Sequence, residues 1–380
     1  MTAHFNFISG KLRYAWELVS DSGNNHVTNQ GRIIPKFFLS PSFSGGVPLA
    51  FLEYTTASVS SFRIRALGTV NYDVDWGDGS TESGITAVNK DHTYSTAGVY
   101  TIKITPAEGS TFRPEHYGAP NFGTNLTKVD GAGGSQLGTD LTKWLRETTS
   151  LTSFGFVDVS HVTNFQATWR GCTGLTSFPA IDTSSCTNLQ STWQDCTGLT
   201  SFPLIDTSSV TTFQSCWQSC SGLTSFPLID TSSATTFSYA WQSCSGLTSF
   251  PALNFSNAVS LASSWRSCTG FTTFPSVDFS SGTNFSYAWF ACSSLATYPA
   301  NQFDTTGTLA AAAFHNTFRE CALTAQSIEN ILTSLDTNGA QNIALAIQGG
   351  TNAAKTTWST AANTAYTNLI NKGWTITYNA

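Results

Sequence analysis

The sequence has few charged residues, and those it has are spread thinly. Asp, Glu, Lys and Arg make up 11% of its 380 residues, against roughly a quarter in an ordinary soluble domain. The formal net charge is −6, and no run of basic residues is present. Because nucleic-acid binding requires clustered Lys and Arg that neutralise phosphates, we expect no nucleic-acid partner.

Long apolar runs and an N-terminal leader pattern are also lacking. The first twenty residues contain no continuous apolar segment, and the longest apolar stretch near the front covers only residues 47–52. A membrane-spanning helix needs about 20 apolar residues, and a secretory signal needs an apolar stretch of about 7–15. We therefore expect no signal peptide, no membrane insertion, and folding in a cytosol.

The sequence signatures of catalysis and of metal binding are lacking as well. The six His residues lie in unrelated contexts, and there is no H-E-x-x-H, no G-x-S-x-G and no glycine-rich phosphate loop. Nine Cys is an odd number, and six of them recur at an interval far from the C-x-x-C spacing of zinc sites. We expect no enzyme, no cofactor and no metal site, and we interpret the Cys residues as buried free thiols.

The sequence does contain a strict repeat of 24 residues. Six Trp residues recur at this interval, a Cys follows three residues after each, and columns of Leu or Phe and of Pro keep the same register. The paired positions are Trp169 and Cys172, Trp193 and Cys196, Trp217 and Cys220, Trp241 and Cys244, Trp265 and Cys268, and Trp289 and Cys292. One unit of this length cannot bury its apolar face alone, so the period predicts a solenoid of stacked coils over about residues 125–304.

Within each coil, the apolar spacing predicts a short helical turn followed by an extended segment. Phe213, Trp217 and Cys220 stand at positions i, i+4 and i+7, which share one face of a helix. We expect Gly222 to end that turn, before a segment marked by Pro. Cys216 and Cys220 are the one Cys pair for which a disulfide deserves a test.

An acidic column follows the same period. Its members are Asp158, Asp182, Asp206, Asp230, Asn254 and Asp278. Because like charges one coil apart repel, either a cation lies among these side chains or each accepts hydrogen bonds from nearby backbone N–H groups. The Thr and Ser residues that follow most of them, and the uncharged Asn254, favour the capping interpretation.

The coil sequence resembles a known repeat family. Residues 206–226 read D-T-S-S-V-T-T-F-Q-S-C-W-Q-S-C-S-G-L-T-S-F, which resembles the BspA-like leucine-rich repeats of bacterial surface proteins and phage virion proteins. Phe213 and Trp217 stand where that family has Met and Phe. The resemblance implies leucine-rich repeats over residues 151–321, with an aromatic core.

A second resemblance covers residues 46–106. Residues 74–80 read V-D-W-G-D-G-S, and H-T-Y and then G-V-Y-T-I follow in order, with alternating apolar residues that predict strands. This order resembles the PKD domain, which implies an immunoglobulin-like β-sandwich that acts as a spacer or contacts proteins or glycans. We interpret Asp78 and His92 as turn and packing residues.

The N-terminal segments resemble no family. Residues 12–19 fit either strand or helix, and residues 33–39 predict a strand. From their position, residues 1–45 are a possible docking region, and residues 107–150 are a linker and N-terminal cap of the solenoid.

The C-terminal residues predict an α/β cap. The register breaks after Cys292, with Cys321 five residues late, which indicates an irregular last coil. Thr324 is expected to cap a helix, and an extended segment, a second helix ending near Lys372 and a final strand follow it. Residues 322–380 are therefore expected to close the stack.

The predicted fold is thus a multidomain one: an immunoglobulin-like (PKD) β-sandwich followed by a leucine-rich-repeat-type solenoid of 24-residue coils with an α/β C-terminal cap. Amide and ring groups at low charge suit contact with a sugar or a protein, so they mark a possible ligand or partner face. Its residues are Gln194, Gln218, Gln242, Tyr239 and Tyr287. The alternative is that these side chains are solvated coil edges that avoid stacking like charges.

The order of these modules resembles that of phage virion proteins. It implies a non-enzymatic virion structural protein, a tail or tail-fibre component that is exposed on the particle and mediates attachment to the host surface. The expected partners are other virion proteins and a host-surface glycan or protein, and the expected location is the virion after folding in the host cytoplasm. A capsid decoration protein without a receptor role, a bacterial cell-surface adhesin and a glycan-cleaving fibre remain as alternatives.

Overall fold

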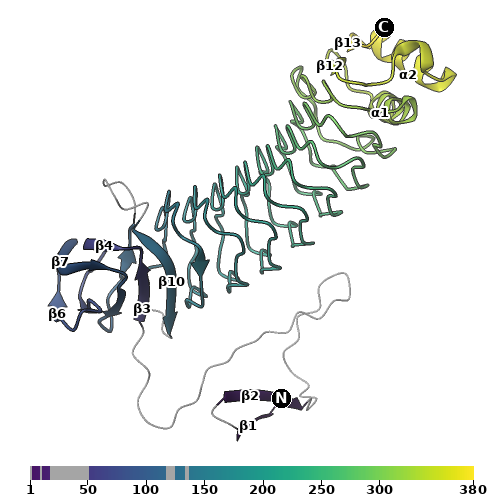
Figure 1. Ribbon diagram of the computed structural model, residues 1–380. Coiled ribbons are helices and arrows are strands. Elements are labelled where there is room, and N and C mark those ends of the chain that lie inside the picture. Colours follow the sequence, from purple (N-terminus) through teal and green to yellow (C-terminus); the bar gives the residue numbers. More distant parts are fainter. Residues whose placement is uncertain (1, 9–10, 18–50, 117–124, 133–136) are drawn as a thin grey trace. The chain divides into compact units, whose positions relative to one another are not determined.

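The computed structural model describes residues 2–8, 11–17, 51–116, 125–132 and 137–380 (Figure 1). The chain divides into two units, residues 1–47 and 48–380. In the first unit, β1 (Thr2–Ile8) and β2 (Lys11–Glu17) pair antiparallel. The segment that fitted either strand or helix is therefore a strand where it is described. The strand expected over residues 33–39 lies outside the described residues.

The second unit begins with two open β-sheets. The strands are β3 (Phe51–Thr56), β4 (Val59–Leu67), β5 (Tyr72–Asp75), β6 (Thr81–Ile85), β7 (Asn89–Gly98), β8 (Thr101–Pro106) and β9 (Arg113–Pro114). One sheet has the order β7-β4-β9, and the other has the order β11-β10-β3-β8-β5-β6, in which β10 is Leu126–Ala132 and β11 is Ser153–Phe154. Apolar side chains alternate along β3 and β8, so one face of each strand is buried. Trp76 and Tyr72 are fully buried in this core.

Strand β10 (Leu126–Ala132) joins the sheet to the coils that follow. It pairs antiparallel with β3 on one side and parallel with β11 (Ser153–Phe154) on the other. The indole N–H of Trp144 donates to the Tyr54 hydroxyl at 2.9 Å, and the backbone N–H of His116 donates to the Trp144 carbonyl at 2.6 Å. Residues 107–150, which were expected to be a linker, therefore form hydrogen bonds to the strands that precede them and to the coil that follows them.

From residue 140 onward the chain forms coils that stack at the predicted interval of 24 residues (Figure 1). Parallel bridges join equivalent positions of successive coils: Asp140, Asn164, Asn188, Thr212, Thr236, Ser260 and Asn284. Most of each coil consists of turns and irregular backbone rather than strands. The fold of the described residues is therefore β-rich, with open sheets and few helices.

The predicted helical turn in each coil is wrong. Residues 213–220 form successive turns in which alternate N–H groups leave the coil: those of Phe213, Ser215, Trp217 and Ser219 donate to carbonyls of the next coil. The N–H groups of Cys216, Gln218 and Cys220 donate to carbonyls three residues back within the same coil. An α-helix satisfies its N–H groups internally, so bonding between coils replaces it here.

Gly222 does not end the turn in the way that was predicted. It lacks the left-handed backbone of a C-cap glycine, whereas Ser215 and Ser219 adopt that conformation with φ of 55° and 63°. A Cβ atom on Gly222 would lie 2.6 Å from the Thr197 carbonyl oxygen and 2.9 Å from that of Leu199. Glycine is needed at this position because the preceding coil approaches too closely for a side chain.

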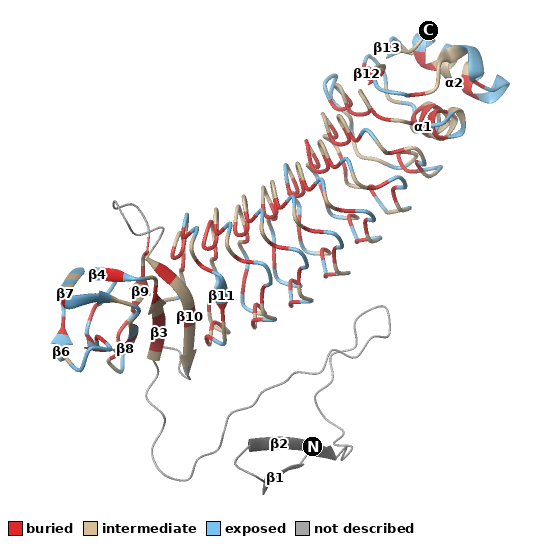
Figure 2. Cartoon of the chain, in the orientation of Figure 1, coloured by how far each residue is buried: buried red, intermediate tan, exposed pale blue. Residues whose placement is uncertain are grey.

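The interior of the coils is aromatic, and buried residues line it along the stack (Figure 2). The six Trp residues of the repeat are fully buried and stack with ring centroids 5.1–5.9 Å apart. Phe side chains of the neighbouring column meet these rings edge-on, as Phe226 does at 4.8 Å from Trp217 and 5.4 Å from Trp241. Each coil therefore completes the core of the next.

The C-terminal elements agree closely with prediction. Helix α1 (Ala325–Asn338) begins at the N-cap Thr324, whose side chain accepts from the Ser327 N–H, and it buries Ile328, Ile331, Leu332 and Leu335. Strand β12 (Ala344–Ile347) pairs parallel with β13 (Thr375–Tyr378). Between them lie a short 3-10 helix, η2 (Lys355–Thr357), and helix α2 (Thr360–Asn371).

Helix α1 also satisfies polar groups at the end of the stack. The Ser327 hydroxyl accepts from the Tyr298 N–H at 3.0 Å, and the Ser334 hydroxyl accepts from the Phe303 N–H at 2.8 Å. Within the part of the chain that the structure describes, no helix combines the length and the apolar character needed to cross a membrane.

Candidate ligand-contact surface

Asp78, Ser80 and His92 meet beside the turn between β5 and β6. His92 Nε2 lies 2.8 Å from Asp78 Oδ2, and the Ser80 hydroxyl donates to Asp78 Oδ1 at 2.5 Å. The Ser80 hydroxyl, followed by His92, holds the pKa of the Asp78 carboxyl below its usual range. Because Ser80 donates to the carboxylate and lies 3.5 Å from His92, this geometry ties the turn to β7 and does not activate the hydroxyl as a nucleophile.

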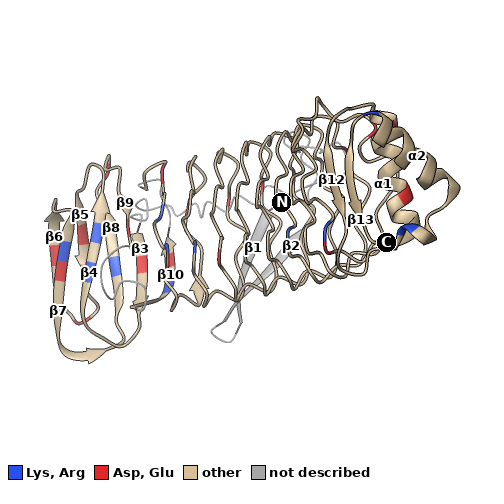
Figure 3. Cartoon of the chain, turned by 90° about the horizontal axis from the view of Figure 1, so that it is seen from above, with Lys and Arg blue, Asp and Glu red and all other residues tan. Residues whose placement is uncertain are grey.

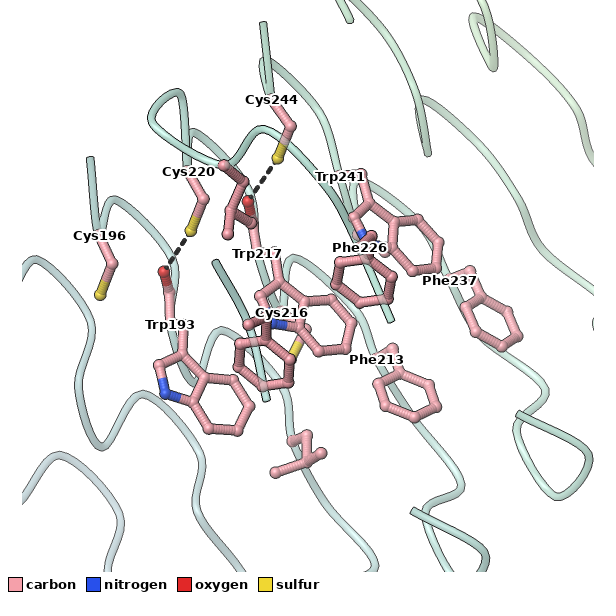
Figure 4. Packing of buried hydrophobic residues seen from close by; sticks show 14 of the residues in the cluster. Trp193, Cys196, Phe213, Cys216, Trp217, Cys220, Phe226, Phe237, Trp241 and Cys244 are labelled. Carbon is pink, nitrogen blue, oxygen red and sulfur yellow. Dashed lines mark hydrogen bonds between the residues drawn. The ribbon is translucent and has the colours of Figure 1, made fainter. Parts of the chain in front are cut away.

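The Cys column is a line of hydrogen-bond donors inside the coils. The thiol of Cys220 donates to the backbone carbonyl of Trp193 at 3.0 Å, and that of Cys244 donates to Trp217 at the same distance (Figure 4). All nine Cys residues are free and buried, including Cys216 and Cys220. Burial raises the pKa of the Cys196 thiol to about 12, so these thiols are protonated packing groups.

The acidic column forms turn caps. Asp206 Oδ1 accepts the Ser208 N–H at 3.0 Å and its hydroxyl at 2.7 Å, and Asp158, Asp182 and Asp230 repeat this pair of bonds. Asn254 and Asp278 accept the backbone N–H two residues on. This is the capping geometry. Among the described residues, no three His, Cys, Asp or Glu side chains are grouped to hold a metal ion.

The residues directly after the six Trp positions of the repeat, together with those after Leu145 and Phe318 at the equivalent positions of the flanking coils, form a separate column, which we call the Gln/Arg row. Its members are Arg146, Arg170, Gln194, Gln218, Gln242, Arg266, Phe290 and Arg319. Every one is partly exposed. The row contains no carboxylate, so its polar members, four Arg and three Gln, all offer N–H donors.

Backbone hydrogen bonds fix the position of the Gln/Arg row. The carbonyl of Gln242 accepts the N–H of Ser219 in the preceding coil at 2.7 Å, and the Gln242 N–H donates to the Tyr239 carbonyl at 3.2 Å. The Arg266 carbonyl accepts from Ser243 at 2.7 Å in the same way. The donors of successive coils are therefore held at a regular interval, close to the ~4.8 Å spacing of neighbouring strands.

The structure brings the three predicted Gln residues together and separates the two predicted Tyr residues. Gln194, Gln218 and Gln242 are neighbours in the row, and Gln218 Nε2 donates to Gln242 Oε1 at 3.2 Å. Tyr239 is 39% exposed, and Tyr287 lies two coils further along the stack. Both have left-handed backbone conformations, with φ of 63° and 57°.

Sequence reasoning missed a cationic and aromatic cluster around Tyr287. The Arg266 guanidinium lies over the rings of Phe290 and Tyr287, at 5.1 and 5.6 Å from their centroids. The Arg319 guanidinium lies 6.0 Å from the Phe290 centroid, and the His315 ring meets Tyr287 at 5.3 Å. The 24-residue period contained the signal, since Arg266 and Phe290 occupy the column of the three Gln residues.

Charged residues are sparse over the coils compared with the strands of the two sheets (Figure 3). Three arginines of the row are paired with acids: Arg146 with Glu147 at 2.9 Å, Arg170 with Asp195 at 3.5 Å, and Arg319 with Glu320 at 3.4 Å. These pairs are partly exposed, so each contributes little to stability. Their effect is to neutralise charge along the row.

The Gln/Arg row can donate hydrogen bonds to an extended ligand and present rings to its apolar faces. Searches of protein-family profiles, of curated proteins and of solved structures find no match to this chain.

Proposed function

We propose that the chain is a non-enzymatic virion surface protein, a tail or tail-fibre component that mediates attachment to the host surface through the Gln/Arg row. One observation carries the proposal. Donor side chains occupy seven of the eight positions of the row, and from Arg170 onward the backbone carbonyl of each position accepts an N–H of the preceding coil. A row held in this way loses little conformational freedom on binding, which favours contact with a repetitive surface polymer or protein.

The proposed architecture assigns a role to each part. The sheets of residues 51–116 form an immunoglobulin-like sandwich of the PKD type, the coils form a leucine-rich-repeat-type solenoid, and residues 322–380 close it. Support for this arrangement comes from the order β11-β10-β3 in a single sheet, through which the ladder of hydrogen bonds runs into the first coil. Residues 1–45 would dock the protein to the particle.

A capsid decoration protein is the second candidate. The same regular stack favours this role, because a rigid spacer needs no ligand. A decoration protein is expected to bind virions but not cells. An adhesin of a bacterial surface would use the same row for contact.

Binding of the full chain to intact candidate host cells tests the proposal. We compare it with a triple variant, Gln194→Ala, Gln218→Ala and Gln242→Ala, and expect at least a tenfold weaker binding, because three donors are lost. The matched control changes Thr200, Thr224 and Thr248 to Ala; these exposed residues belong to the same coils but lie outside the row. Melting curves check that both variants fold.

Equal binding by both variants would refute the role of the row. Removal of residues 1–47, which form a unit of their own, separates the two candidates. Host attachment predicts that this variant still binds cells and no longer joins virions. If the full chain joins virions but never binds cells, the decoration role replaces attachment.

A further inference from the structure

Arg266 differs from the other three arginines of the Gln/Arg row, because no carboxylate of the described residues pairs with its guanidinium. In the other coils the paired acid follows the arginine directly or stands 25 residues later. For Arg266 these two positions hold Ser267 and Ala291. Its positive charge is therefore not neutralised by a neighbouring side chain, in a chain whose net charge is −6.

Two aromatic rings position this charge. The guanidinium lies over Phe290 and Tyr287 at 5.1 and 5.6 Å from the ring centroids, and a second guanidinium, that of Arg319, lies 6.0 Å from Phe290. No group of the described residues accepts a hydrogen bond from this guanidinium, so its N–H donors remain available to a ligand. The rings thus hold the charge in place beside the row.

We propose that Arg266, Tyr287 and Phe290 form a binding site for the carboxylate of an acidic polysaccharide that runs along the Gln/Arg row. The inference rests on the proposed function and names its ligand class. A guanidinium offers two parallel N–H donors that match the two oxygens of a carboxylate. Tyr287 and Phe290 add apolar surface against the C–H groups of a sugar ring.

The neighbouring coils suit the uncharged part of such a polymer. Gln218 and Gln242 occupy the two coils before Arg266, and their amides can donate to and accept from sugar hydroxyls. Since the coils repeat at a fixed interval, one extended chain can contact the amides and the guanidinium together. A carboxylated sugar polymer fits this sequence of groups better than a small anion, which would use Arg266 alone.

The test measures binding of the full chain to polygalacturonate and to the same polymer with its carboxyl groups reduced to alcohols. The variant is Arg266→Gln, which installs the side chain that the row already has at Gln242 and two earlier coils. The matched control is Arg63→Gln, which removes the same formal charge from β4, outside the row, at a site paired with Asp91. We expect Arg266→Gln to weaken binding at least tenfold and Arg63→Gln to change it less than about twofold. The reduced polymer should not bind.

Three results would overturn the proposal: absence of polygalacturonate binding by the full chain, equal loss in the two variants, or equal binding of the reduced polymer. Inorganic polyphosphate is the further probe, because a site for anions in general would bind it with the same dependence on Arg266. Cell binding separates the two proposals. If the full chain binds host cells but not polygalacturonate, the ligand class is wrong while the attachment function stands.

Discussion

The thiol of Cys220 donates a hydrogen bond of 3.0 Å to the backbone carbonyl of Trp193, in the preceding coil. The same bond recurs from Cys172 to Cys321, each time to the carbonyl of the residue at the Trp position or its equivalent. The side chains of the Cys column therefore do more than pack in the core: each also donates a hydrogen bond to the preceding coil. The Trp193 carbonyl also accepts the backbone N–H of Cys196 at 3.2 Å, so the thiol of the next coil is its second donor and links the two coils.

Replacing Cys220 by Ala should destabilise the protein by about 1–2 kcal/mol, because it removes one of the two hydrogen bonds that the Trp193 carbonyl accepts and opens a small cavity. Urea unfolding followed by Trp fluorescence measures the change. Cys220→Ser is the control, since its hydroxyl can still donate to the same carbonyl. If the Ala and Ser variants lose equal stability, the hydrogen bond contributes nothing beyond packing.

The buried thiols predict a loss of stability at alkaline pH. Burial raises the folded-state pKa of Cys196 and Cys268 from 9.0 to about 12. A raised pKa means that the stabilising contribution is complete below about 9, the unfolded value, and is lost as pH rises toward the folded value. The melting temperature should therefore fall steadily above about pH 9.

A variant checks that thiols cause this fall. Cys268→Ala removes one buried thiol. Near pH 10 the slope of the unfolding free energy against pH should therefore become less steep, by up to the amount that corresponds to about one bound proton. The comparison cancels the contributions of Lys and Tyr, which are the same in both proteins. An unchanged slope would assign the alkaline loss to those other groups.

Ser219→Gly should stabilise the protein by up to about 1 kcal/mol. Ser219 has a left-handed φ of 63°, and the same column holds Gly171 with a φ of 75°. Glycine adopts this conformation without the steric cost that a Cβ imposes. Ser221→Gly, at an exposed position without a positive φ, is the control and should be neutral or destabilising. A higher melting temperature only for the first variant is the expected outcome.

Gly222→Ala should destabilise the protein by about 1–3 kcal/mol, because the new Cβ would lie 2.6 Å from a carbonyl oxygen of the preceding coil and the backbone must shift. The control is Ser294→Ala, which changes the equivalent residue of a later coil, where a Cβ is already accommodated. Calorimetry of both variants measures the difference. Similar losses in the two would show that the close approach at Gly222 is not what limits this position.

How far the sequence predicts the structure differs between elements. Helix α1 was predicted with its N-cap Thr324 and its buried face, because a capping residue and a 3.6-residue apolar period act within one local segment. The turn at Phe213 and Trp217 shows the same i, i+4, i+7 spacing, yet it is not a helix. Its N–H groups bond to the next coil, and an isolated segment gives no sign of that partner.

The candidate surface, too, was predicted only in part from the sequence. The period placed Gln194, Gln218 and Gln242 in one column, and nearest-neighbour stacking made them adjacent. It could not show that Arg266 lacks a carboxylate partner, because the acids that pair with the arginines of the row lie either one or 25 positions after them. Which of these pairs forms depends on the direction of each side chain.

The sequence by itself determined the 24-residue interval, the identity of the buried columns, the start of helix α1 and the end of helix α2, because these follow from patterns of side chains along the chain. Only the tertiary structure decided the conformation inside each coil, the need for glycine at Gly222 and the unpaired charge of Arg266. The physical reason is that each of these depends on atoms of an adjacent coil, which approach only when the coils have stacked.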